Sequence, residues 1–594
     1  MIGGRWMSRR FVWHGLIAVV TAIGLTGCAL IPTTGPVVQI SPTTVPTNAR
    51  PVDVEPAPPV QDGDPDEILA GFLTAVASGS PNRWAIARQY LTPRAAGEWD
   101  PTSGVTIYSS DGPQPIVTDQ SAVLKTPVIG QIDADGHFTA VDDQDFTHNF
   151  AMVEDATGQW RIDDPGSGIF ISQYRFQTSF RAVPVYFFTK TLDRLLVENL
   201  YVNWSDATPT TAVEGLLKGP SAWLSPAALT VIPAQTKLVA SSVPVQNGVA
   251  QVSLTQPAAG LSDTQQVQLA AQLLSTLQAV QPAISGVRID VAGVPMAVRG
   301  QGTDGVVRAD TIAGYTTAPP PQSQSAFGLL DDGTVIKLPT DPGAAAQPVP
   351  GPLGMAGSDW GDEITSLAVS PDGSTLALAS ASSLWLASTT SGAPANKSFD
   401  AKGLVRPQAD SGGVWAIAGG SVPTLRYVPY GGLVVSTTLD ELAGATIIAF
   451  RVSPDRSRMA VLARIDGHDM LGLLRIGSTA PLSVDGWRPL VVNTGRGTLD
   501  NCLDVGWTSA MQLVVLASAT KDASVVVYRL DVDAALVESL GPIGDDTPVS
   551  LAAQPRSDGQ TLLVVTGTGN VLRYEDRTHW SSLVSGLKTI ALPG

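Results

Sequence analysis

The stretch ITSLAVSPDGSTLAL at residues 364–378 has the pattern of two short strands joined by a Ser-Pro-Asp-Gly turn. Proline fixes φ at such a turn, aspartate hydrogen-bonds back to the backbone, and glycine adopts a positive φ. The pattern recurs as AFRVSPDRSRMAV at 449–461, and weaker copies are VGWTSAMQLVV at 505–515 and PRSDG at 555–559. The C-terminal half is therefore built from repeated strand–turn–strand units.

These repeats predict a β-propeller over residues 305–594, because units of about 40–50 residues with four short strands each are typical of propeller blades. The length allows about five to seven blades, and we expect about six. The runs at 513–516 and 562–565 are continuously apolar, which suits strands that are buried on both faces. A pair of β-sandwiches is the alternative fold for the same pattern.

The chain begins with an export signal. Arg5, Arg9 and Arg10 precede an apolar segment at 16–25 that is too short to be a permanent membrane span. It ends in Leu25-Thr26-Gly27-Cys28, which matches the lipobox of bacterial lipoproteins. The alternative is an ordinary secretory signal in which the cysteine is incidental.

The lipobox predicts a signal peptide at 1–27 and a lipidated cysteine at position 28. Cys28 would become an S-diacylglycerol cysteine and an N-palmitoyl cysteine, because a thiolate forms a stable thioether with the diacylglyceryl group. Two acyl chains suffice for stable anchoring. We therefore expect the mature protein on the extracytoplasmic face of the cell membrane, exported by the Sec or the Tat route.

A segment rich in proline and threonine follows, and it predicts an extended stalk over residues 28–63. Folded structure then begins with a helix, because Asp64 can act as N-cap, Pro65 suits the first helical position and Glu67 completes a capping box. Short strands end in a strand that contains Trp160. Helices followed by one strongly bent sheet resemble the cone-shaped NTF2-like α+β fold, which we assign to residues 64–183.

The segments VYFF (185–188), AVEGLLKGP (212–220), IPAQTKL (232–238), VQNGVAQVSLT (245–255) and VRIDVAGVP (287–295) resemble the GerMN domain of spore germination lipoproteins. The resemblance implies a small α/β domain over residues 184–304, without catalytic residues. From the residues themselves, we expect helices after Thr208 and Ser262, a strand that starts at 232–238, and a hairpin at Asn247-Gly248.

The composition and the motifs argue against several chemistries. The formal net charge is −17, which disfavours nucleic-acid binding. The sequence contains no nucleophile elbow and no phosphate-binding loop. The few histidines lack ligand spacing, so we expect no metal and no other cofactor. The residues that could suggest otherwise have simpler interpretations: Asp142, Asp143 and Asp145 as a solvated loop, His468 as a propeller loop residue, Cys502 as a small core or loop residue, and Gly567-Thr568-Gly569 as a hairpin turn.

Taken together, the lipobox, stalk, cone-like domain, GerMN-like domain and propeller are similar to the LpqB family of actinobacterial lipoproteins. The resemblance implies a non-enzymatic accessory of the MtrAB two-component system, which binds the extracellular domain of the sensor histidine kinase MtrB and modulates signalling in cell-wall homeostasis and division. The alternatives are a lipoprotein that binds cell-wall glycan or peptide, and a propeller hydrolase with carboxylates or a metal at its central channel.

Overall fold

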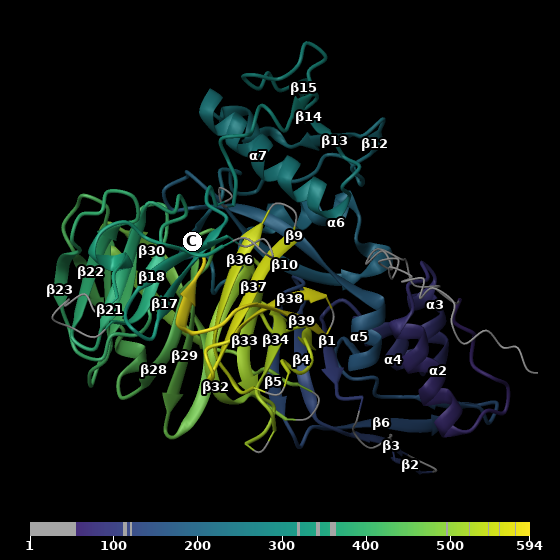
Figure 1. The fold of residues 1–594 in the computed structure, drawn as a ribbon. Coiled ribbons are helices and arrows are strands. Elements are labelled where there is room, and N and C mark those ends of the chain that lie inside the picture. The colour runs from purple at the N-terminus through teal and green to yellow at the C-terminus, as the bar shows by residue number, and fades with distance from the viewer. Residues whose placement is uncertain are drawn as a thin grey trace, which may run out of the picture. The chain divides into compact units, whose positions relative to one another are not determined.

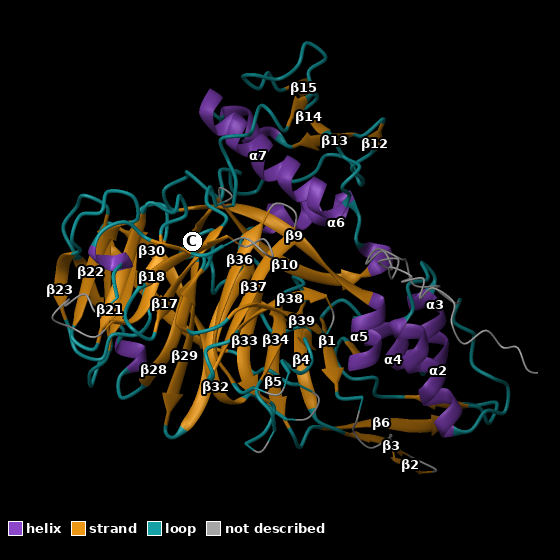
Figure 2. Ribbon diagram, in the orientation of Figure 1, coloured by secondary structure: helices purple, strands orange, loops and turns teal. Residues whose placement is uncertain are grey.

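A computed structural model describes residues 55–110, 116–118, 121–317, 321–339, 345–356, 364–494, 497–521, 523–544, 546–556, 559–576 and 578–594 (Figure 1). The predicted signal peptide and most of the predicted stalk lie outside these residues. In the part that is described, every α-helix precedes residue 281 and strands make up the C-terminal half (Figure 2).

The first region starts with helix α2 (Pro65–Ala77), as its cap predicts. The Glu67 side chain accepts a hydrogen bond from the backbone N–H of Asp64 at 3.3 Å, and α2 buries Ile68 and Phe72. The other elements are α3 (Arg83–Ala87), η1 (Arg88–Tyr90), α4 (Pro93–Glu98), β1 (Gly104–Tyr108), β2 (Ile116–Thr118), β3 (Ser121–Lys125), β4 (Val128–Asp133), β5 (Phe138–Asp143), β6 (Thr147–Glu154), β7 (Trp160–Ile162), β8 (Ile169–Ser172) and α5 (Gln173–Ser179).

These strands confirm the α+β class, but they form two sheets where the sequence predicts one bent sheet. The sheet orders are β5-β4-β1-β8 and β2-β3-β6-β7. Strand β1 pairs in parallel with β8, which brings residues 105–108 to residues 169–172. Such a distant partner leaves no local sequence signal. The region also continues beyond the Trp160 strand, which forms an edge.

The second region is a small α/β unit in which two helices pack on two sheets. Its elements are β9 (Phe180–Thr189), β10 (Leu195–Asn203), η2 (Trp204–Asp206), α6 (Pro209–Lys218), β11 (Ala228–Leu229), β12 (Val245–Gln246), β13 (Val249–Leu254), η3 (Gln256–Gly260), α7 (Asp263–Val280), β14 (Gly286–Val291), β15 (Val294–Pro295) and β16 (Val307–Arg308). The predicted caps are confirmed, because Thr208 caps α6 and Ser262 forms a capping box with Gln265. Asn247 and Gly248 form the hairpin turn with φ of 51° and 76°.

Two details of the second region differ from the sequence prediction. Residues 232–238 form a turn rather than the start of a strand, since Gln235 has a φ of 66° and Pro233 cannot donate to a ladder. Only an isolated bridge joins Leu238 to Leu254. In addition, β16 lies beyond the predicted boundary at residue 304 yet pairs with β14 of this region.

The third region has six sheets of four strands each, so the prediction of about six propeller blades is confirmed. The blades are β19-β18-β17-β40, β20-β21-β22-β23, β24-β25-β26-β27, β28-β29-β30-β31, β32-β33-β34-β35 and β36-β37-β38-β39. The last strand of the chain, β40 (Leu587–Ala591), completes the blade that β17 (Ser325–Leu330) begins. The ring is thereby closed by segments from opposite ends of the domain.

The bounds of the other propeller strands follow in chain order. They are β18 (Val335–Pro339), β19 (Gln347–Pro348), β20 (Ile364–Val369), β21 (Thr375–Ser380), β22 (Ser383–Ser388), β23 (Asn396–Asp400), β24 (Gln408–Ala409), β25 (Gly413–Ala418), β26 (Thr424–Pro429), β27 (Val435–Thr438), β28 (Thr446–Val452), β29 (Arg458–Ile465), β30 (His468–Thr479), β31 (Leu482–Pro489), β32 (Asp500–Ser509), β33 (Gln512–Ser518), β34 (Val526–Asp531), β35 (Val537–Ser539), β36 (Pro548–Arg556), β37 (Gly559–Thr566), β38 (Val571–Asp576) and β39 (His579–Val584).

The repeated turns occupy equivalent places in four blades, where each joins the first strand of a blade to the second. The Ser-Pro-Asp-Gly turn links β20 to β21, and its Asp372 accepts a hydrogen bond from the backbone N–H of Ser374 at 3.0 Å. The second copy links β28 to β29, and there Arg456 takes the position of the glycine with a φ of 58°. The weaker copies link β32 to β33 and β36 to β37; Ser557 and Asp558 of the last copy lie outside the described residues.

Candidate functional site

The strands β20, β24, β28, β32, β36 and β40 each stand at one end of their sheet and together surround the axis of the propeller. A cavity of about 420 Å³ lies where these strands reach the repeated turns, and Pro371 and Pro454 of those turns line it. Three residues from outside the blades also line the cavity: Arg194 from the loop between β9 and β10, and Thr317 and Pro321 from the segment that leads into the propeller. The cavity is therefore built by the propeller together with the second region.

Five arginines line this cavity, although the protein as a whole is acidic. They are Arg194, Arg406, Arg451, Arg456 and Arg556, whereas Asp410 is the one acidic residue among the lining residues that the structure describes. None of these arginines was predicted from the sequence to be a site residue. Their positions could have indicated the cluster, because Arg451, Arg456 and Arg556 all lie within or beside copies of the repeated turn.

Two carboxylates, the buried Asp504 and the partly buried Asp410, pair with three of the arginines. Asp504 lies 3.1 Å from Arg406 and 3.7 Å from Arg451, and it accepts hydrogen bonds from two backbone N–H groups. Burial raises the pKa of Asp504, although Arg406 opposes this shift. Asp410 pairs with Arg456 and also accepts a hydrogen bond from Trp415 Nε1 at 2.7 Å. The guanidinium groups are thus fixed before any ligand arrives.

The hydrogen-bonding capacity of the arginines is not used up by these contacts. Arg406 Nη1 and Arg456 Nε are buried, and neither has a hydrogen-bond partner among the described residues. Burial and the neighbouring Arg456 lower the pKa of Arg194. The site can therefore attract and bind negative charge. Among the lining residues that the structure describes, there is no histidine, cysteine or glutamate that could act as nucleophile or general base.

A second feature is the contact surface between the propeller and the two preceding regions, which together with it belong to one unit spanning residues 52–594. Arg458, only 3% exposed, donates from Nη2 to the carbonyl of Val197 at 2.8 Å and lies 3.5 Å from the buried Asp455. Trp223 Nε1 donates to the carbonyl of Gly486 at 2.9 Å. The hydrogen bonds of Arg458 to Val197 and of Trp223 to Gly486 each join a side chain to a backbone carbonyl that is distant in the sequence.

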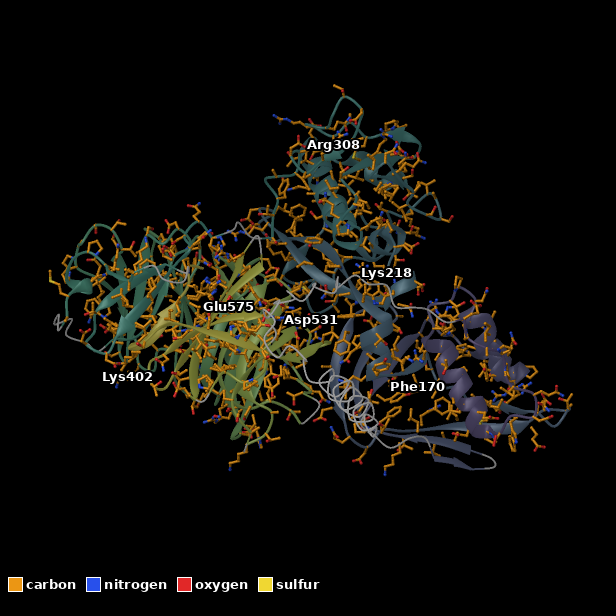
Figure 3. The ribbon with its side chains drawn as sticks, turned by 45° about the vertical axis from the view of Figure 1, so that its right-hand side comes forward. Phe170, Lys218, Arg308, Lys402, Asp531 and Glu575 are labelled. Carbon is orange, nitrogen blue, oxygen red and sulfur yellow. The ribbon has the colours of Figure 1, made fainter. Side chains whose placement is uncertain are left out.

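Two carboxyl groups of the propeller meet one tyrosine at this surface. The Tyr201 hydroxyl lies 3.2 Å from Asp531 Oδ2 and 3.1 Å from Asp533 Oδ1; Figure 3 labels Asp531. A hydroxyl carries one proton, so both contacts are hydrogen bonds only when one carboxyl group is protonated. Burial and the adjacent Asp533 raise the pKa of Asp531 to about 7, and burial also raises the pKa of Asp533.

The residues weighed in the sequence analysis lie apart from the cavity. Asp142, Asp143 and Asp145 are exposed, as predicted, but Asp142 and Asp143 end strand β5 rather than lying in a loop. His468 is also exposed, at the first position of strand β30 rather than in the predicted loop. Cys502 is buried, and this burial raises the pKa of its thiol to about 12. The described residues include no group of three or more histidine, cysteine or acidic side chains that could hold a metal.

The predicted lipidation site Cys28 lies outside the residues that the structure describes. Within the described ranges, no helix has both the length and the apolar character that a membrane crossing requires. Lipidation of Cys28 therefore stays a prediction.

Three family models match consecutive parts of the chain. Residues 58–177 match the N-terminal domain of lipoprotein LpqB, residues 184–297 match the sporulation and spore germination family Germane, and residues 334–593 match the LpqB β-propeller domain. Among solved structures, TolB from Acinetobacter baumannii is similar at 16% identity and a TM-score of 0.34, over 60% of this chain and 98% of that one.

Curated relatives match over almost their whole length. Lipoprotein LpqB of Cutibacterium acnes is 29% identical over 582 residues, which cover 96% of this chain and 97% of the relative. Lipoprotein LpqB of Streptomyces avermitilis is 27% identical, with 100% and 99% covered. With its LpqB N-terminal, GerMN and β-propeller domains in this order, the chain belongs to the LpqB family of lipoproteins.

Proposed function

We propose that this protein is a non-enzymatic lipoprotein on the extracytoplasmic face of the cell membrane that binds the extracellular domain of an MtrB-like sensor histidine kinase. Binding would modulate two-component signalling in cell-wall homeostasis and division. The observation that carries the proposal is the similarity, over nearly the whole chain, to proteins named lipoprotein LpqB.

The anchor rests on Cys28, which follows the apolar segment of the signal peptide within the lipobox. The Cys28→Ala variant should leave the membrane fraction and accumulate as soluble protein or as retained precursor, because it lacks the thiol that accepts the diacylglyceryl group. Cys502→Ala is the matched control, since Cys502 is buried in the propeller, and it should stay in the membrane fraction. Unchanged fractionation of Cys28→Ala would refute the anchor.

A binding role is supported by the chemistry of the cavity. The lining residues that the structure describes include no nucleophile–base pair, and their one acidic side chain, Asp410, already accepts hydrogen bonds from Arg456, Trp415 and Gly412. A glycan-binding role would favour exposed aromatic side chains that stack on sugar rings. The one aromatic residue in the described lining is Trp507, which is 3% exposed.

Kinase binding is tested with the soluble chain of residues 29–594 and the purified extracellular domain of the sensor kinase from the same organism. We expect saturable binding by biolayer interferometry. Photo-crosslinking residues introduced at Tyr174, Val294 and Leu433, which are 62%, 66% and 88% exposed, would identify the region that contacts the kinase. Absence of binding by the full chain, together with retention on purified peptidoglycan, would replace the proposal by the wall-binding alternative.

A further inference from the structure

We propose that the cavity at the end of the propeller channel binds a small organic anion that carries at least two negative charges on carboxylate or phosphate groups. This inference goes beyond the proposed contact with a kinase. It concerns a site inside the ring rather than an outer surface.

The first support is the charge of the lining. Arg194, Arg406, Arg451 and Arg456 pair with three acidic side chains, Asp193, Asp410 and Asp504. These four guanidinium groups therefore outnumber their acidic partners at the cavity. Partial burial of these guanidinium groups has a desolvation cost that a bound anion would offset.

The second support is the unused hydrogen-bonding capacity. A buried donor without a partner destabilises the protein, and two such donors, Arg406 Nη1 and Arg456 Nε, belong to residues that line the cavity. Guanidinium groups bind carboxylate and phosphate oxygens in a bidentate manner. An anion with two or more such groups would satisfy several donors at once.

The third support is the shape of the cavity and the apolar character of part of its wall. The volume of about 420 Å³ suits a small molecule. Pro371, Pro454, Ala552 and Ile590 line it beside the arginines. Apolar groups would pack poorly against a bare inorganic ion, so the ligand should have an organic body.

The fourth support is the contribution of the second region. Arg194 lies in the loop between β9 and β10, and its Nη2 donates to Ser411 Oγ of the propeller at 3.0 Å. A bound anion would contact this loop as well as the blades. Ligand binding should therefore also strengthen the contact between the second region and the propeller.

The test uses isothermal titration calorimetry on the soluble chain of residues 29–594 at low ionic strength. The probes are citrate as the carboxylate arm, glucose 6-phosphate as the phosphate arm, and glucose as the neutral control. We expect glucose not to bind and at least one anion to bind; the arm that binds identifies which oxyanion group the site prefers. The affinity should fall as salt is added.

Matched variants show whether binding occurs in the cavity. Arg451→Gln and Arg194→Gln should each weaken the affinity by roughly tenfold or more, because each loses a charge-assisted contact. Arg194 is in a loop outside the blades, so its variant tests the site even if Arg451→Gln fails to fold. Arg308→Gln is the control, since Arg308 lies outside the cavity and pairs with Asp304 at the surface (Figure 3). Absence of binding by both anions, or equal affinity in the Arg194 and Arg308 variants, would overturn the proposal.

Discussion

Replacement of Asp531 by asparagine should stabilise the protein at pH 8 and have much less effect at pH 5. In the native structure Asp531 and Asp533 both face the Tyr201 hydroxyl, with burial and their mutual repulsion opposing the second ionisation. The substitution Asp531→Asn keeps the size of the side chain and removes its charge. The variant therefore isolates the cost of holding two ionised carboxyl groups against one tyrosine.

The magnitude follows from the pKa of Asp531, which is about 7 in the native protein and 3.8 for an ordinary aspartate. At pH values between 3.8 and about 7, the Asp531–Asp533 pair of the folded protein holds a proton that the unfolded chain has released. The free energy of unfolding therefore falls as the pH rises through this range. The slope is about 1.4 kcal/mol per pH unit up to the native pKa. From pH 5 to pH 8 the wild type should lose about 3 kcal/mol that Asp531→Asn keeps.

The assay is urea denaturation of both proteins at pH 5 and pH 8, followed by tryptophan fluorescence. The measured quantity is the difference in the free energy of unfolding between variant and wild type, which cancels titrating groups remote from Asp531, Asp533 and Tyr201. Asp304→Asn is the control, because Arg308 and a backbone N–H lower the pKa of Asp304 to about 2 and its effect should be the same at both pH values. A difference for Asp531→Asn that does not change with pH would refute the reasoning.

Three further predictions concern buried groups. Arg458→Met should lower the free energy of unfolding by about 3–5 kcal/mol, measured by urea denaturation, because it leaves Asp455 buried without its cation; a loss below about 1 kcal/mol would contradict this. Trp415→Ala should cost about 3–5 kcal/mol in the same assay, since Trp415 is fully buried, and an unchanged midpoint would contradict it. The Cys502 thiol, with its pKa raised to about 12, should react with iodoacetamide only after unfolding; rapid labelling of the native protein would contradict its burial.

Local sequence signals predicted much of the fold. The caps at Asp64, Thr208 and Ser262 and the hairpin at Asn247-Gly248 are set by residues within a few positions of one another, and the structure confirms them. The repeated turns predicted the propeller because each copy contains its own dihedral requirements. The pairings that the sequence did not predict join separate segments, namely the parallel pairing of β1 with β8 and the antiparallel pairing of β16 with β14.

The arginine-lined cavity could not be predicted in the same way. Arg194, Arg406 and Arg556 are separated by more than a hundred residues from one another, and only closure of the ring brings them to one space. In the sequence each of them is an isolated basic residue in an acidic chain. The orphaned donors of Arg406 and Arg456 become visible only when burial and hydrogen-bond partners are known.

The pairing of β17 with β40 has a consequence for how the protein matures. Strand β40 lies more than 250 residues after β17 in the sequence, so β17 can pair with it only after those residues have been synthesised. Contacts over such a separation form slowly. Until then the first blade is incomplete and has an open edge, which is prone to wrong pairing with other chains. We therefore expect folding, rather than the finished ring, to be the vulnerable stage, and chaperones to bind the chain until its last strand has paired.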